Sequence, residues 1–244
     1  MADTDMIEPL LLNLEQRDRL SDDEREMLRM AITRERRVAA QEDIVTEGDR
    51  PLTSSLLLDG FAARYNITGD GQRQLTSLHV AGEFIDLHAF LVKTMDHGII
   101  ALSPCRIAMA DHSALKTITE SAPHLARLLW LDTLLQAAIS RQWIVAMGRR
   151  SRAAHLAQII CELYMRLQIV NRVEGGSFHF PLSQTQMADI MGLSTVHMNR
   201  VIQELRAAGF VTWSRERITI LDWGRLQRFA EFDPAYLNIR SEPR

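Results

Sequence analysis

Cysteine is scarce in this sequence: two of its 244 residues, Cys105 and Cys161, are cysteines. A disulfide framework or a cysteine-ligated metal site needs several thiols at regular spacing, so we expect neither. An iron–sulfur cluster would take about four thiolates, and the cysteine count excludes it as well. Both cysteines stand among apolar residues, and we predict that each fills a hydrophobic core.

Long apolar segments are missing too. No run approaches the roughly 20 apolar residues that span a bilayer, so we expect no membrane contact. The first ten residues, MADTDMIEPL, are acidic and unlike a secretory signal, which predicts a cytoplasmic protein. The sequence also has no P-loop, nucleophile elbow, GxGxxG or HExxH motif, so we do not expect an enzyme.

Charge is unevenly distributed, although the net charge is only −3. From Arg149 onward there are 13 Arg and Lys against 9 Asp and Glu, whereas the first 148 residues hold 15 against 22. A mildly basic C-terminal part beside an acidic N-terminal part suits contact with DNA at one end of the chain.

Residues 181–211 carry the clearest local signals. Ser183 can cap a first short helix, with Gln186 at the capping-box position. Gly192 can end that helix in the left-handed conformation, and Ser194 can cap a second helix. Two short helices joined by a tight glycine turn predict a helix-turn-helix motif.

The second of these helices has two unlike faces. Its apolar residues recur at helical spacing and are expected to pack inward. The opposite face is polar, and Arg, Asn and Gln side chains can bond the edges of guanine and adenine in the major groove. The residues expected to contact double-stranded DNA are Ser183, Ser194, Thr195, Val196, His197, Asn199, Arg200 and Gln203. The alternative is a helical hairpin in an unrelated small domain, with these side chains merely solvated.

A hairpin is predicted directly after this motif. Residues 210–213 and 218–220 alternate apolar and polar around Arg215-Glu216-Arg217, as the strands of a wing would. We therefore predict a winged helix-turn-helix domain over residues 149–225.

The N-terminal part is predicted to be a β domain over residues 13–120, which we interpret as a sensor. Within it, residues 13–37 have apolar residues at helical spacing, with Ser21 and Glu24 as a cap, and indicate one or two leading helices. From Val38 to Asp111, glycine-rich turns separate short apolar runs about every ten residues. This pattern is typical of an antiparallel jelly roll.

Residues 121–148 are predicted to form a long dimerisation helix and a hinge, which gives an α+β fold class for the chain. One apolar stripe has heptad-like spacing and is expected to face a second copy, while its neighbour packs on the β domain. The alternative is a core helix of a monomer. The hinge is expected where Gly148 interrupts the pattern, with Ser151 capping the next helix. The first stripe is Leu128, Leu131, Leu135, Ala138, Gln142 and Val145, and the second is Leu125, Leu129, Ile139 and Trp143.

This order of elements resembles the Crp/Fnr family of bacterial transcription regulators. The resemblance covers residues 13–225 and is clearest in LSQTQMADIMGLSTVHMNRVIQELRAAGFV and GRRSRAAHLAQIICEL. It implies a homodimer that binds an inverted repeat, contacts RNA polymerase and responds to an effector in the β domain. Arg200 stands at the position of the family's recognition-helix arginine, and Val196 stands where many members have a glutamate that reads cytosine.

The expected effector site departs from the family's cyclic-nucleotide pattern. Asp86-Leu87-His88 replaces the second Gly-Glu pair, and Asp96-His97-Gly98 lies near the position of the phosphate-binding Arg. Without that Arg we do not expect a bound cyclic nucleotide. No other cofactor is expected, because the cysteines of an iron–sulfur cluster are missing and no His or Cys has the setting of a haem ligand. The candidate effector pocket is Gly82, Glu83, Asp86, His88 and His97. From a different class, the chain could be a ligand-binding module whose C-terminal domain recruits protein rather than DNA.

Three histidines of the β domain invite a metal or pH-sensor interpretation. His79, His88 and His97 are spaced nine residues apart, which matches no common metal-ligand motif. We therefore expect surface or hydrogen-bonded core histidines and no metal site.

Overall fold

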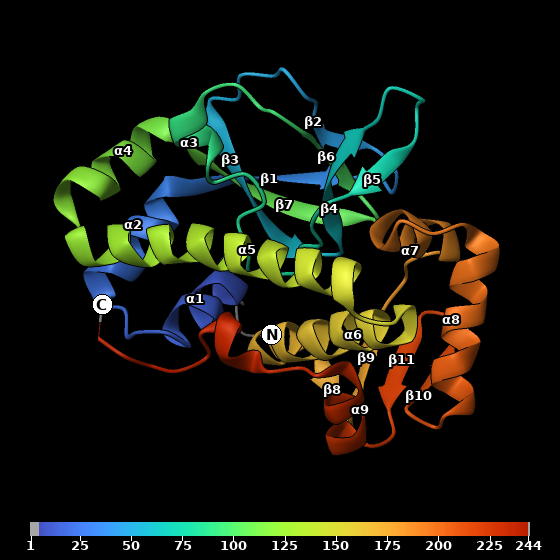
Figure 1. Ribbon diagram of the computed structural model, residues 1–244. Helices are drawn as coiled ribbons and strands as arrows, with labels where there is room; N and C mark the ends of the chain where they lie inside the picture. The colour runs from blue at the N-terminus through green and yellow to red at the C-terminus, as the bar shows by residue number, and fades with distance from the viewer. Residues whose placement is uncertain (1–4, 244) are drawn as a thin grey trace. The chain divides into compact units, whose positions relative to one another are not determined.

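The computed structural model describes residues 5–243 (Figure 1). Residues 1–4, where the acidic N-terminal segment begins, and Arg244 lie outside the described residues. The chain divides into two compact units, and no helix within residues 5–243 is both long and apolar enough to cross a membrane. The first unit consists of Met1–Asn66, Ser77–Ala137 and Asn238–Arg244, and the second of Ile67–Thr76 and Ala138–Leu237.

In the described part of the chain, strands β1 to β7 form two antiparallel sheets, with the orders β1-β7-β3 and β2-β6-β4-β5. The predicted antiparallel β domain is therefore confirmed. The strands are β1 (Ile32–Val38), β2 (Asp43–Val45), β3 (Thr53–Asp59), β4 (Ala62–Ile67), β5 (Arg73–Leu75), β6 (Gly98–Ala101) and β7 (Cys105–Asp111).

Glycines set the turns between these strands. Gly48, Gly60, Gly71 and Gly82 all have a positive φ, between 82° and 92°. Gly60, between β3 and β4, also has no room for a side chain, because a Cβ there would collide with the carbonyl oxygen of Pro104. Any other residue at this position would have to displace the backbone.

The leading helices are shorter than predicted. The capping box that starts the helix α2 is confirmed: Ser21 Oγ accepts from the Glu24 N–H at 3.3 Å, and the Glu24 carboxylate accepts from the Ser21 N–H at 2.9 Å. The prediction of helix up to residue 37 is wrong, because β1 begins at Ile32 and pairs with β7. The pairing of β1 with β7 stabilises a strand here more than the helix propensity of Arg and Glu stabilises a helix. The helices are α1 (Glu8–Glu15) and α2 (Asp22–Ala31).

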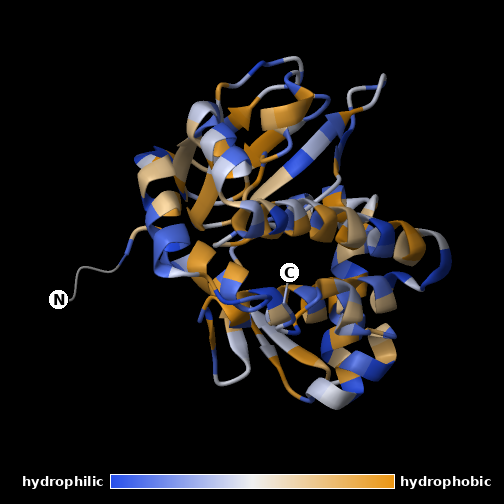
Figure 2. Ribbon diagram, turned by 90° about the vertical axis from the view of Figure 1, so that its left-hand side faces the viewer, coloured by the Kyte–Doolittle hydropathy of each residue, from blue (hydrophilic) through white to orange (hydrophobic). Residues whose placement is uncertain are grey.

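A hydrophobic core joins the sheets to the helices of this unit. One buried cluster includes Leu10 of α1, Leu28 of α2 and Leu56 of β3. Another lies within the strands and includes Val38 and Ile99. Figure 2 shows the helices banded in hydrophilic and hydrophobic residues, as expected for helices that bury one face. The sequence did not indicate α3 (Ala89–Val92) or α4 (His112–Ser121), which complete the unit.

The predicted long helix is confirmed as α5 (Pro123–Arg149). It continues through Gly148, so the predicted interruption falls later, at Arg150 and Ser151. The predicted partner-facing stripe is partly wrong, because Leu128 and Leu135 are buried within the protomer. The second stripe is buried, but only its Leu125 and Leu129 belong to the core of the β domain as predicted, whereas Trp143 donates to Glu162 of the second unit. The exposed apolar side chains, which we call the α5 stripe, are Trp130, Leu134, Ile144, Val145 and Met147, between 37% and 70% exposed.

The second unit combines helices with a small antiparallel sheet of order β10-β11-β9-β8. The predicted cap at Ser151 is confirmed, since its Oγ accepts from the Ala154 N–H at 3.1 Å. The elements are α6 (Arg152–Ile169), β8 (Val173–Glu174), β9 (Ser177–His179), α7 (Gln184–Met191), α8 (Thr195–Ala207), β10 (Val211–Ser214), β11 (Arg217–Ile220), α9 (Trp223–Ala230) and the 3₁₀ helix η1 (Pro234–Leu237).

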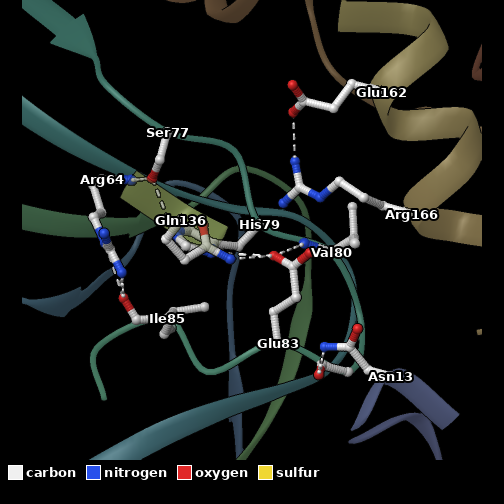
Figure 3. A network of polar contacts seen from close by, with 11 residues as sticks. Asn13, Arg64, Ser77, His79, Val80, Glu83, Ile85, Gln136, Glu162 and Arg166 are labelled. Atoms are coloured by element: carbon white, nitrogen blue, oxygen red, sulfur yellow. Dashed lines mark hydrogen bonds and ion pairs between the residues drawn. The ribbon is translucent and has the colours of Figure 1, made fainter. Parts of the chain in front are cut away.

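A buried charge pair lies inside this unit (Figure 3). Glu162 and Arg166 are one turn apart on α6, and Arg166 Nη1 lies 2.8 Å from Glu162 Oε1. Glu162 Oε2 accepts from Trp143 Nε1 of α5 at 3.2 Å and from the Tyr236 hydroxyl of η1 at 2.8 Å. Burial raises the pKa of Glu162, while Arg166 and the two donors oppose this rise. The Glu162 carboxylate therefore links α6 to both α5 and η1 by hydrogen bonds.

His155 of α6 is fully buried, and neither ring nitrogen has a hydrogen-bond partner within the described part of the chain. Burial, with a smaller effect of Arg152 and Arg150, lowers the pKa of His155 to about 4. The imidazole is therefore neutral in the folded protein at pH 7. An unfolded chain takes up a proton at the ordinary pKa near 6.5, so acid favours unfolding.

We expect this difference to appear in the pH dependence of stability. The contribution of the neutral His155 to the free energy of unfolding is complete above pH 6.5, and it is lost as the pH falls toward 4. Between pH 7 and pH 5 it should lower the free energy of unfolding by about 2 kcal/mol. In His155→Leu this loss should be absent, as measured by urea denaturation at pH 5, 6 and 7. The control is His197→Leu, at an exposed position, which should keep the wild-type slope. Parallel profiles for His155→Leu and the wild type would contradict the assignment.

Candidate DNA-binding site and β-domain pocket

The helix-turn-helix forms as its caps predict. Ser183 Oγ accepts from the Gln186 N–H at 3.2 Å, and Gln186 Oε1 accepts from the Ser183 N–H at 2.7 Å. Gly192 ends α7 with a φ of 64°. Ser194 begins α8 by accepting the His197 N–H at 3.3 Å. Both serine hydroxyls serve as caps, and the helix N-termini that they mark are suited to DNA phosphates.

The two faces of α8 separate as predicted. Met198, Val201, Ile202 and Leu205 are at most 6% exposed and fix the helix on its unit. The other face is open to solvent, apart from the half-buried Asn199. The exposed members of the predicted DNA-binding set are Ser183, Ser194, Thr195, Val196, His197, Arg200 and Gln203.

The side chains of this face differ in whether they already form a hydrogen bond within the protein. Asn199 Nδ2 donates to Gln184 Oε1 of α7 at 3.1 Å, which fixes its orientation. Arg200 is exposed and has no ion pair or hydrogen bond to another described residue. Val196 is 65% exposed, an apolar group on a polar face. The guanidinium of Arg200 is therefore free to bind a ligand, and Val196 could contact a thymine methyl.

The predicted wing is confirmed as the β10–β11 hairpin, in which Val211 pairs with Ile220 and Ser214 with Arg217. Its turn holds Arg215 in the left-handed region, with a φ of 52°. Arg215 and Arg217 are both exposed, so the hairpin presents two cations suited to DNA phosphates.

In the β domain, the predicted effector residues have different immediate partners. Glu83 belongs to a buried polar network (Figure 3), and the adjacent Gly82 is buried as well. Asn13 Nδ2 donates to the Gly82 carbonyl at 2.9 Å. Glu83 Oε2 lies 3.3 Å from His79 Nδ1 and accepts from Gln136 Nε2 at 3.4 Å. The Glu83 carboxylate is therefore occupied by groups of the protein.

Asp86 is buried beside β3. It accepts hydrogen bonds from the backbone N–H and the hydroxyl of Ser55. Burial raises the pKa of Asp86 to about 7, against the opposing effects of Ser55 and Arg64. Asp86 also lines a pocket of about 270 Å³ together with Arg36 and Arg50. No motif in the sequence singled out Arg64, whose guanidinium donates to the Ile85 carbonyl at 2.9 Å.

The rings of His88 and His97, nine residues apart in sequence, lie against each other. Their rings stack with centroids 5.1 Å apart, and His97 Nδ1 lies 2.8 Å from Asp96 Oδ1. Burial and the charge of Arg64 lower the pKa of His88 to about 3, and burial also lowers the pKa of His97. Both rings are therefore neutral at pH 7.

Two family models match the chain. The cyclic nucleotide-binding domain matches residues 35–122, and the Crp-like helix-turn-helix domain matches residues 154–229. The chain belongs to the Crp/Fnr family. The matched regions contain β2 to β7, the second half of β1 and the whole α7–α8 motif with its wing.

Similar proteins are Crp/Fnr regulators. The transcriptional activator protein FnrL of Cereibacter sphaeroides is 21% identical over 77% of this chain and 76% of its own length. The nitrogen fixation regulation protein FixK of Bradyrhizobium diazoefficiens is 24% identical over 78% of each chain. The structure of FixK2 from Bradyrhizobium japonicum aligns with a TM-score of 0.73 at 20% identity, covering 80% of this chain and 96% of FixK2. This likeness shows a shared fold.

The Crp/Fnr assignment decides between the functions that the sequence left open. The protein is a sequence-specific DNA-binding transcription regulator, and its family is one of regulators rather than enzymes. The alternative of a C-terminal domain that recruits protein instead of DNA is not favoured.

Proposed function

We propose that this regulator binds an inverted-repeat operator as a homodimer, with one α8 in the major groove of each half-site. The observation that carries the proposal is the exposed polar face of α8, held on a capped helix-turn-helix. The α5 stripe supports the dimer, because a row of exposed apolar side chains along one helix is suited to a second copy of the same helix.

The β domain is proposed to receive the signal that sets DNA affinity. A cyclic nucleotide is not the proposed signal, because the Glu83 carboxylate is engaged by His79 and Gln136 rather than free for a ribose hydroxyl. RNA polymerase is a further proposed partner, since relatives such as FnrL are named transcriptional activators.

The first experiment is selection of bound sequences from random DNA by the purified full-length chain at near-physiological salt, where non-specific phosphate binding is weak. A palindrome whose half-sites lie about one helical turn apart is the expected result. A selected site without twofold symmetry would contradict the homodimer, and no enrichment with or without added cyclic nucleotides would contradict autonomous DNA recognition.

Arg200 is the residue proposed to read a base. We expect Arg200→Ala to weaken operator binding by about 1–3 kcal/mol, or roughly 5- to 150-fold, and to relax specificity at one position of each half-site. Fluorescence anisotropy with the selected operator measures the affinity, and repeated selection measures the specificity. The matched control is Arg228→Ala, an exposed arginine of α9 outside the α7–α8 motif. Equal affinity and specificity for Arg200→Ala and the wild type would refute base reading by Arg200.

A further inference from the structure

Two imidazoles and a carboxylate meet near the start of β6. One ligand atom from each of His88, Asp96 and His97 lies within 4.8 Å of the others. His88 stands at the N-terminal end of α3, and Asp96 and His97 directly precede β6. We propose that this cluster is a binding site for a borderline divalent transition-metal ion such as Zn²⁺.

The first support is the hydrogen bonding of the two rings. His88 Nε2 and His97 Nε2 are both buried and have no hydrogen-bond partner among the described residues. A buried polar atom without a partner is destabilising, and two of them side by side are unusual. His124 gives the contrast in the same unit, because its two ring nitrogens are paired with Glu24 at 2.7 Å and Asp18 at 3.1 Å. A bound cation would satisfy both rings of the cluster at once.

The backbone around the cluster is held in place. The Met95 N–H donates to the Asp49 carbonyl at 2.9 Å, and the Gly48 N–H donates to the Met95 carbonyl at 2.8 Å. The Met95 side chain is buried, and Asn66 Nδ2 donates to the Asp96 carbonyl at 3.3 Å. These contacts order the loop that carries two of the three ligands before any ion binds. The three ligand atoms already lie within 4.8 Å of one another, near the roughly 3.4 Å that separates ligands in a tetrahedral zinc site.

The donor set selects the class of ion. Imidazole nitrogen suits Zn²⁺, Co²⁺ and Ni²⁺, whereas Mg²⁺ and Ca²⁺ prefer oxygen ligands throughout. The Asp96 side chain is 80% exposed, which gives an ion a path from solvent and leaves positions for water. Arg64 is a nearby cation that lowers the pKa of both rings, and the carboxylates of Asp86, Asp132, Glu83 and Asp96 oppose the effect of burial on Arg64 itself.

The test is a titration of the full-length, chelator-treated chain without DNA, so its result does not depend on operator binding. Calorimetry with ZnCl₂ should show one ion per chain, and MgCl₂ should show none. His88→Ala and His97→Ala should each weaken Zn²⁺ binding at least tenfold. Removing a group that merely supports a metal ligand already weakens binding about tenfold, so removing a ligand itself should have at least this effect. The control His179→Ala, an exposed imidazole beside Glu216 in another sheet, should bind as the wild type does.

A second variant tests the ligand role of position 97 without relying on lost binding. His97→Cys would offer a thiolate, and its Co²⁺ complex should show a sulfur-to-metal charge-transfer band that the wild-type complex lacks. Absence of this band in a folded, Co²⁺-binding variant would overturn the site. Zn²⁺ binding by the His88→Ala, His97→Ala double variant at wild-type strength, or no binding by the wild type, would overturn it as well.

Discussion

Leu134→Glu combined with Ile144→Glu should convert the homodimer into monomers and weaken operator binding at least about 100-fold. These side chains are 50% and 70% exposed, so a carboxylate at either position is solvated in the monomer. In a dimer the same groups would be desolvated opposite their own copies, where like charges repel. The loss in affinity follows because each monomer would engage a single half-site. Sedimentation velocity measures the mass, and anisotropy with a full operator measures the affinity.

The matched control is Leu52→Glu, which changes an 81% exposed leucine outside α5. This variant should remain dimeric and bind DNA normally. If the α5 variant also stays dimeric at low micromolar concentration, the α5 stripe is not the interface. If it becomes monomeric but keeps its affinity for the full operator, the dimer is not what binds DNA.

Glu162→Ala should lower the free energy of unfolding by about 3–5 kcal/mol. The substitution removes the carboxylate that Arg166 contacts at 2.8 Å, so a guanidinium that is 4% exposed loses this counter-charge. It also leaves the buried donors Trp143 Nε1 and Tyr236 O–H without their acceptor. Urea denaturation followed by tryptophan fluorescence gives the free energy.

Two further variants distinguish the effect of the lost Glu162 charge from the effect of the lost side-chain volume. Glu204→Ala removes the same group from an exposed position of α8 and should change stability by less than about 0.5 kcal/mol. Glu162→Leu with Arg166→Leu removes both buried charges together and should be more stable than Glu162→Ala, which keeps the buried charge of Arg166 and removes the opposite one. A double variant as unstable as Glu162→Ala would mean that the charge of Arg166 is not the cause.

The helix-turn-helix could be predicted in detail because its signals are local. Ser183 caps a helix by reaching a backbone N–H three residues away, and Gly192 ends it through its own φ. Ser151 and Ser194 act in the same way. Each of these contacts spans at most four residues, so neighbouring sequence specifies it.

Features that depend on partners far away in the sequence could not be predicted as well from the sequence. The local sequence of residues 32–37 predicts helix. In the structure these residues pair with β7, about 70 residues further along the chain, and so form a strand. The periodicity of α5 was clear, but periodicity says which residues share a face and not which neighbour covers it. Leu128 therefore lies in the protomer core, although the sequence suggested an interface.

The candidate metal site shows the same limit. His88 and His97 are separated by a short helix and a loop that turns at Lys93, where φ is 71°. Nothing in the spacing of nine residues predicts that the chain reverses so that the rings stack. The partners of Glu83 could not be foreseen for a related reason, since Gln136 and His79 come from α5 and from the preceding loop.

The two native thiols leave the chain well suited to site-specific spectroscopy. Burial raises the pKa of Cys105 to about 11 and that of Cys161 to about 12. Maleimides react with accessible thiolates, so both native cysteines are silent toward them at neutral pH. A fluorophore or spin label would therefore attach only at a cysteine introduced on the surface. Distances between α8 and the β domain can be followed in otherwise unaltered protein.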